Sequence, residues 1–272
     1  MHTAADPDAP VIYRHPLPVR LMHWVNVVCV FILLMSGLNI FNAHPALYWG
    51  RDSNFAAPLL QITQTGEGAG QRGVLRVGGA QFDTTGVLGL SGGSAANGPS
   101  ARAFPSWATV PGPQWLAMAR LWHFFFAWIF VLNGVAYVAY TVLSGHLRRD
   151  LVPTRGEVRR IGRSIKDHLL LRHAHGEDAR RYNVLQNIAY LSVIFVILPM
   201  IVVGGWAMSP MMDAFAPGWT DLFGGRQALR TLHFTGAALL VAFILVHVFE
   251  TIITGLVNNI RSMITGYWKV PK

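Results

Sequence analysis

Residues 230–248, RTLHFTGAALLVAFILVHV, decide the fold that we expect for this chain. The run is apolar and close to the length of about 20 residues that a helix needs to cross a bilayer, yet it carries two histidines. His233 and His247 are 14 residues apart, which is nearly four helical turns, so both project from one face of the helix, about 21 Å apart along its axis. One histidine is therefore expected near each surface of a membrane.

The composition of the whole chain also indicates a membrane protein. Of its 272 residues, 52% are hydrophobic and only 13% are charged, whereas an average soluble domain carries about 25% charged residues. So few charges could not cover a soluble surface. We predict an all-α membrane protein, a four-helix transmembrane bundle. The predicted spans are Leu21–Phe41, Trp115–Leu143, Val184–Met208 and Thr231–Val257.

The cysteine count and the net charge exclude several classes of function. A single cysteine, Cys29, excludes an internal disulfide, a thiolate-held iron–sulfur cluster, a zinc site built on several cysteines and c-type haem attachment. The net charge of +9 could indicate nucleic-acid binding. In an apolar chain it indicates instead Lys and Arg retained on one side of a membrane, and we expect no nucleic-acid partner.

The distribution of basic residues orients the helices. Most of the 22 Lys and Arg lie in the two terminal segments and in residues 144–182, which are therefore expected in the cytoplasm. The first apolar run begins late and is not followed by a small-residue cleavage site, so we expect a retained helix. The predicted parts are a cytoplasmic N-terminus (1–22), a helical domain (23–257) with a periplasmic loop (42–114) and a cytoplasmic loop (144–182), and a cytoplasmic C-terminus (258–272).

The two long loops have different compositions. Within the outer loop, GQRGVLRVGGAQFDTTGVLG (residues 70–89) predicts short strands or turns. The loop also carries aromatic residues that a flexible linker would not need, so we expect either a small cap on the bundle or a docking surface for a partner. The cytoplasmic loop predicts a basic amphipathic helix around Val158–Leu171 at the lipid surface.

Two further histidines lie at depths that match those of the fourth span. The first helix runs outward, so His23 lies near the inner surface with His247, and the second runs inward, so His123 lies near the outer surface with His233. A single histidine in a span is more often a structural hydrogen-bonding residue. Two imidazole pairs facing each other across a bundle are what two six-coordinate b-type haems require. We predict these four histidines to be the iron ligands.

An arginine precedes three of these histidines by three residues: Arg20, Arg120 and Arg230. This spacing places each guanidinium on the face of its histidine, one turn nearer the surface, where haem propionates would pair with it. For Arg20, on the cytoplasmic side, an interfacial arginine that snorkels to the headgroups is an adequate alternative.

Two other residues are weaker candidates for haem contacts. Gly37 lies 14 residues after His23 and would let a flat macrocycle approach the backbone, although small residues also serve ordinary helix packing in membranes. Trp24 could stack on a porphyrin or belong to the aromatic belt at the interface. Glu250, an acid inside a span, could pass protons to a quinone or simply reach water near the helix end.

Five motifs in the sequence resemble those of a known family. They are HPLPVRLMHWVN (15–26), RLWHFFFAWIFVLNG (120–134), GHLRRDLVP (145–153), RYNVLQNIAYLSVIFVILPM (181–200) and the stretch 230–248. The chain resembles the bacterial cytochrome b561 and nickel–iron hydrogenase b-type cytochrome superfamily, in particular the membrane subunits of the thiosulfate reductase type. The resemblance to related formate dehydrogenase subunits implies the same pairing, His23 with His247 and His123 with His233.

The resemblance implies a role as well as a fold. Such subunits lie in the bacterial cytoplasmic (inner) membrane, bind two haems b and carry electrons between the quinone pool and a periplasmic molybdopterin oxidoreductase, without being the catalytic subunit themselves. One alternative is a stand-alone, quinone-linked superoxide oxidase like the smaller cytochrome b561 proteins. The other is a non-redox anchor or transporter whose histidines bind protons or a metal.

Overall fold

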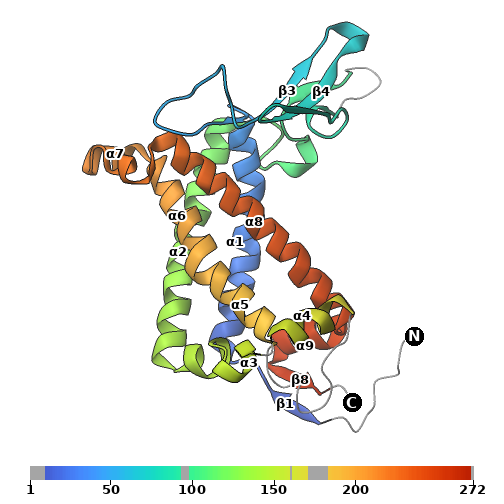
Figure 1. Cartoon of the computed structure of the whole chain (residues 1–272), viewed down its shortest axis with the longest axis vertical. Coiled ribbons are helices and arrows are strands. Elements are labelled where there is room, and N and C mark those ends of the chain that lie inside the picture. The colour runs from blue at the N-terminus through green and yellow to red at the C-terminus, as the bar shows by residue number, and fades with distance from the viewer. Residues whose placement is uncertain (1–9, 93–97, 160, 171–182, 271–272) are drawn as a thin grey trace. The chain divides into compact units, whose positions relative to one another are not determined.

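The computed structural model describes residues 10–92, 98–159, 161–170 and 183–270. Four helical spans are long and apolar enough to cross a membrane, as the sequence predicted. They are α1 (Leu17–Phe41), α2 (Leu116–Leu143), a third span made of α5 (Val184–Ser192), the π-helical turn η5 (Val193–Ile197) and α6 (Leu198–Ala207), and α8 (Arg226–Ile253). Figure 1 labels the five α-helices of these spans.

The spans leave most of their apolar side chains uncovered. In the most apolar part of each span, no more than 22% of the residues are buried. A soluble protein rarely exposes contiguous apolar surface on this scale, whereas the hydrocarbon of a bilayer accepts it. The chain is therefore a multi-pass membrane protein.

The fourth span differs in its bounds from the sequence prediction. It runs from Arg226 to Ile253 instead of from Thr231 to Val257, because Gly255 adopts a left-handed conformation (φ 110°) in which the helix cannot continue. A separate helix, α9 (Leu256–Thr265), follows it. The C-terminal segment, predicted only as a cytoplasmic tail, therefore begins inside a helix.

The two ends of the described chain pair with each other. Strand β8 (Tyr267–Lys269) follows α9 and runs antiparallel to β1 (Val11–Tyr13), with Ile12 opposite Trp268. The Arg14 guanidinium lies 4.4 Å from the ring centre of Trp268. This small sheet ties the segment before α1 to the segment after α9.

Pro199 and a capping box explain the segmented third span. Proline has no N–H to donate and its ring clashes with the carbonyl four residues earlier, and the chain makes the π-helical turn η5 directly before α6, the helix that contains Pro199. At the other end, Asn183 Oδ1 accepts from the Leu185 N–H at 3.0 Å and Gln186 Oε1 accepts from the Asn183 N–H at 3.2 Å, which fixes the start of α5.

Contacts divide the chain into two compact units. The first comprises Met1–Val25, Asn133–Pro199 and Ala238–Lys272, and the second comprises Asn26–Leu132 and Met200–Ala237. The first unit contains η3 (Leu147–Leu151), α3 (Arg155–Arg159) and α4 (Ile161–Leu169). Helices thus occur where the sequence predicted one over Val158–Leu171, of which residues 160 and 171 lie outside the described ranges.

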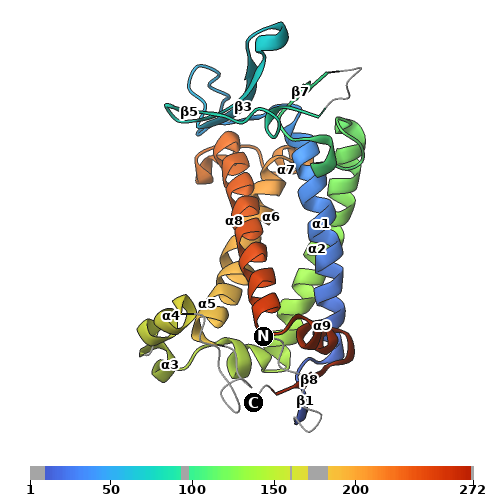
Figure 2. The same ribbon diagram turned by 90° about the vertical axis from the view of Figure 1, so that its right-hand side faces the viewer.

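The second unit contains β-structure that the all-α prediction for the chain did not include, although the loop was expected to form short strands. Four strands pair in the order β2 (Ala46–Leu47), β3 (Leu60–Thr65), β4 (Arg72–Val77) and β5 (Ala80–Asp83), and β6 (Gly89–Ser91) pairs with β7 (Ser100–Arg102). Figure 2 shows these strands beyond the ends of α1 and α8 that belong to the same unit. Short helical segments complete this unit: η1 (Gly68–Gly70), η2 (Ser106–Ala108), α7 (Pro210–Phe215) and η6 (Trp219–Phe223).

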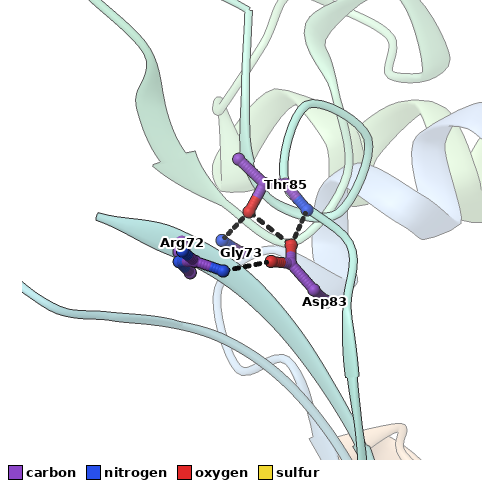
Figure 3. Close-up of polar contacts among 4 residues, drawn as sticks. All are labelled: Arg72, Gly73, Asp83 and Thr85. Atoms are coloured by element: carbon purple, nitrogen blue, oxygen red, sulfur yellow. Dashed lines mark hydrogen bonds and ion pairs between the residues drawn. The ribbon is translucent and has the colours of Figure 1, made fainter. Parts of the chain in front are cut away.

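The loop has its own apolar core and a polar cluster. Phe41, at the end of α1, packs with Leu47 and Ile62. Figure 3 shows the cluster, in which Asp83 accepts hydrogen bonds from Thr85 and from Arg72 Nη1 at 3.1 Å. The bonds from Thr85 are the main cause that lowers the pKa of Asp83, and Arg72 lowers it further. The described residues of the segment 42–114 are therefore folded, and we call them the cap.

Where β6 crosses the sheet, its backbone at Gly89 lies so close to the backbone of β3 that no side chain would fit between them. A Cβ at Gly89, where φ is 78°, would lie 2.2 Å from the carbonyl oxygen of Thr63. Gly89→Val should destabilise the cap, because a strained φ costs roughly 1–3 kcal/mol and overpacking about as much again. Limited proteolysis in detergent should then cut within residues 42–114 while the spans stay intact.

Gly79→Ala is the matched control, because a Cβ there meets no atom within 4 Å. It should remain as resistant to protease as the wild type. Equal resistance of Gly89→Val and Gly79→Ala would contradict the close crossing.

Candidate functional site

The four histidines predicted as ligands form two pairs. The ring centres of His23, on α1, and His247, on α8, lie 6.5 Å apart. Those of His123, on α2, and His233, on α8, lie 6.2 Å apart. Each pair lies within one compact unit, the first pair in the first unit and the second pair in the second unit. The same pairs were predicted from the depths of the histidines in the sequence, and their role as ligands stays a prediction.

The spacing of each pair suits a metal between the rings. A metal bound at about 2 Å from one nitrogen of each imidazole separates the ring centres by roughly 6 Å. Within the described parts of the chain, no group of three or more His, Cys, Asp or Glu side chains could hold a metal ion. Two imidazoles are too few for a bare zinc ion, but they complete the coordination of an iron whose four in-plane positions a porphyrin supplies.

His123 and His233 are called the outer pair, and His23 and His247 the inner pair, after the orientation predicted from the sequence. Hydrogen bonds fix which nitrogen of each outer histidine is free. His233 Nδ1 lies 2.7 Å from the carbonyl oxygen of Ile201, which can only accept, so Nδ1 carries the proton. His123 Nδ1 lies 3.0 Å from Ser36 Oγ, and that hydroxyl already donates its hydrogen to the carbonyl of Ile32 at 2.7 Å. We therefore assign the proton of His123 to Nδ1 as well. Both Nε2 lone pairs are then available to a metal.

Glycines lie directly against the outer imidazoles. A Cβ at Gly37 would lie 3.4 Å from Cε1 of His123, and one at Gly205 would lie 3.4 Å from Cε1 of His233. At Gly204 a Cβ would approach Cβ of His233 to 2.8 Å. Gly37 was predicted to face the macrocycle; in the structure its nearest neighbour is the imidazole ring. Gly204, Gly205 and Ser36 were not predicted from the sequence, in which each is simply a small residue within an apolar run.

Aromatic rings surround the inner pair. Phe243 stacks on His247 with ring centres 5.8 Å apart and planes at 14°, and Tyr190 meets His247 edge-on at 6.4 Å. His23 Nδ1 is buried and has no hydrogen-bond partner among the residues described. A buried polar atom without a partner costs roughly 1–3 kcal/mol, so the inner pair is suited to a further polar group.

Arg20 and Trp24, which flank His23 on α1, bind the backbone of α9. Arg20 Nη1 donates to the carbonyl of Ile264, and Trp24 Nε1 donates to that of Met263 at 3.0 Å. The observed role of both side chains is to hold α1 against the last turn of α9. Their predicted contacts, with a propionate for Arg20 and with the porphyrin face for Trp24, remain predictions.

The two outer arginines have different surroundings. Arg230 donates from Nη1 to the carbonyl of Ala46 and from Nη2 to that of His44, both at 2.6 Å. It thereby braces the start of the cap with two of the five donors of a guanidinium. Arg120 is exposed, with its guanidinium 5.8 Å from the ring centre of Phe124. Of the two, Arg120 has fewer protein contacts and is the freer to meet an anion.

Two arginines lie near His15, in the same unit as the inner pair. Burial is the main cause that lowers the pKa of His15 to about 4, and the nearby cations Arg14 and Arg20 lower it further. His15 precedes α1 and is neutral at pH 7. A cation stabilises a carboxylate placed nearby, so Arg14 and Arg20 suit a carboxylate-bearing cofactor.

Comparison with known proteins identifies the family. Residues 14–266 match the profile of the prokaryotic cytochrome b561 family. The chain belongs to this family. The match includes all four spans and confirms the resemblance found in the sequence motifs. It makes the chain a membrane b-type cytochrome, an electron-transport protein whose cofactor is haem b.

One curated relative extends over nearly the whole cytochrome. It is named "Putative protein-methionine-sulfoxide reductase subunit YedZ1", from Azospira oryzae, and is 28% identical over 253 residues. These residues cover 93% of this chain and 96% of the relative. The similarity therefore includes the cap as well as the spans.

The observed bonds of Arg230 can be tested apart from any haem contact. A hydrogen bond from a charged donor contributes roughly 1.5–3 kcal/mol, so Arg230→Gln should speed amide exchange around His44 and Ala46 at least about tenfold. Arg226→Gln is the matched control, because among the described residues this exposed arginine makes one long side-chain bond, 3.4 Å, to the carbonyl of Met208. Exchange at residues 44–48, measured by mass spectrometry above pH 7, distinguishes the two variants.

The Arg230→Gln substitution should also change the pKa of the His44 side chain. Burial, and after it Arg230, lowers the pKa of His44 below 6.5. Because the pKa of His44 is lower in the folded protein than in the unfolded chain, protonation below about pH 6.5 destabilises the fold. In Arg230→Gln the pKa of His44 should rise toward 6.5. The cap should then lose less stability as the pH falls. An unchanged His44 titration by NMR, together with unchanged exchange, would contradict the bracing role.

Proposed function

We propose that this cytochrome binds two haems b and carries electrons between the quinone pool and an oxidoreductase on the periplasmic face of a bacterial cytoplasmic membrane. The observation that carries the proposal is the presence of two imidazole pairs with ring centres 6.2 and 6.5 Å apart. Both pairs draw one member from α8. A shared helix with a ligand near each end supports one haem toward each membrane surface.

In this proposal His23 and His247 hold the inner haem, and His123 and His233 hold the outer one. Haem supplies one-electron redox chemistry, and the protein supplies ligation, orientation and tuning of the potential. The Ser36 hydroxyl oxygen and the Ile201 carbonyl oxygen accept hydrogen bonds from the Nδ1–H groups of His123 and His233. Such bonds orient an imidazole and raise its basicity, which favours the oxidised iron.

The proposed topology places both termini and residues 144–182 in the cytoplasm and the cap, residues 42–114, in the periplasm. The excess of Lys and Arg in the termini and in residues 144–182 supports this orientation. It assigns residues 23–257 to the haem-binding domain. It also places Arg120 and Arg230 at the outer haem and Arg20 at the inner haem as candidate partners of propionates.

The cap supports assembly with a partner enzyme. It is a folded scaffold that exposes large aromatic side chains, including 74% of Phe55, 77% of Trp107 and 59% of Trp49. Exposed aromatic residues on a rigid scaffold are typical of protein interfaces. The relative described above is named as a reductase subunit, which supports the proposal that a periplasmic molybdopterin oxidoreductase docks there and that this chain is the electron-transfer subunit.

The direct test is reduction by a quinol. The purified protein in lipid nanodiscs, mixed anaerobically with a ubiquinol or menaquinol analogue, should show b-type haem reduction at a rate that saturates with quinol concentration. Dithionite provides the fully reduced reference spectrum. Haem that dithionite reduces but neither quinol reduces would contradict the quinone link.

The same preparation distinguishes the alternative function. A stand-alone superoxide oxidase should reduce its haem with superoxide and release the electrons to quinone without a partner. The proposed subunit should instead exchange electrons rapidly only with quinol, until its partner enzyme is added. Fast haem reduction by superoxide in the isolated protein would favour the alternative.

A further inference from the structure

Helix α9 exposes its apolar face and buries its polar face, the opposite of what is expected for a helix in contact with water. Four of its five apolar residues share one face, at positions i, i+1, i+4 and i+8, and between 40% and 81% of each of these four is exposed. They are Leu256, Val257, Ile260 and Ile264. On a helix at the surface of a soluble protein, such a stripe faces the core.

The polar face of α9 is turned toward the protein instead. Asn258 Nδ2 donates to the carbonyl of Lys269 at 2.8 Å, and Asn258 Oδ1 accepts from the N–H of Lys269 at 3.0 Å. Asn259 Oδ1 accepts from Trp268 Nε1 at 3.3 Å. Ser262 is buried on the same side. These bonds leave the apolar face outermost.

The helix cannot rotate to bury that face. Gly255 and Gly266 flank it, with φ values of 110° and 89°, and a Cβ at Gly266 would lie 2.6 Å from the ring of Tyr13. Arg20 and Trp24 hold the carbonyls of its last turn. Figure 2 shows α9 turned away from the line of α8 after Gly255.

We propose that α9 is a membrane-surface helix, with its apolar face in the acyl chains and Arg261 on lipid phosphates. The bilayer is the occupant that fits, because only two residues separate the start of α9 from Ile253, the last residue of the span α8. Arg261 lines the same shallow depression as Ile260 and Ile264. The sequence 256–272 contains Arg261, Lys269 and Lys272 and no Asp or Glu, which suits an anionic headgroup layer.

Fluorescence quenching in nanodiscs tests the position of α9. In a Cys29→Ala background, Val257→Cys and Ile264→Cys variants carry an environment-sensitive label on the apolar face. Tyr267→Cys is the control, because Tyr267 is exposed on β8. In discs of phosphatidylcholine and phosphatidylglycerol, nitroxide-bearing acyl chains should quench the labels at 257 and 264 several-fold more than aqueous iodide does, and the control should show the reverse.

A comparison of two labelled lipids tests the contact between Arg261 and the lipid phosphates. A trace of nitroxide-labelled phosphatidylglycerol should quench the label at 264 more than the same amount of labelled phosphatidylcholine, and Arg261→Gln should remove that excess. Equal quenching by both labelled lipids would overturn the role of Arg261.

Two results would overturn the membrane position of α9. Labels at 257 and 264 that iodide quenches as strongly as the control would place α9 in water. Labels that neither quencher reaches would show that another protein, or a second copy of this chain, covers the face. Since the quenching does not depend on haem or on electron transfer, it can succeed or fail independently of the proposed function.

Discussion

An imidazole inside a membrane is costly unless its nitrogens have partners, and this requirement organises both units of the chain. Each outer histidine donates from Nδ1 to an acceptor in the protein, Ser36 for His123 and the Ile201 carbonyl for His233. Their remaining nitrogens lie on rings spaced about as far apart as a metal between them requires. The glycines Gly37 and Gly205 make this possible by letting the backbone lie against the imidazole rings.

The inner pair is supported in a different way. Aromatic rings pack on His247, and His23 lies between Arg20 and Trp24, both of which bind the end of α9. The position of the inner histidine therefore depends on a helix at the end of the chain, which is itself tied through β8 to the segment before α1. If α9 rests in the headgroup region, the lipid surface contributes to the support of His23.

Spacing along helices was enough to predict the spans and the histidine pairs, because the period of an α-helix relates sequence separation directly to face and depth. The same rule could not give the partners of Arg230, since a three-residue spacing defines a face and not the carbonyls of His44 and Ala46 that reach it from the cap. Nor could it locate the end of the fourth span: Gly255 lies in an apolar run, and only its positive φ separates α8 from α9. Gly204 and Gly205 were missed because close packing on a histidine of another helix leaves no periodic signal.

The central claim is that each imidazole pair holds one haem b, and the haem-to-chain ratio measures it most directly. A pyridine haemochrome assay combined with quantitative amino-acid analysis should give two haems b per chain for the wild type. His247→Leu and His233→Leu should each retain one haem, and the haem left in one variant should differ spectrally from the haem left in the other. The control His44→Gln, which alters a histidine outside the pairs, should retain both haems. One haem in the wild type, or loss of both from a single ligand variant whose far-UV circular dichroism is unchanged, would contradict the account.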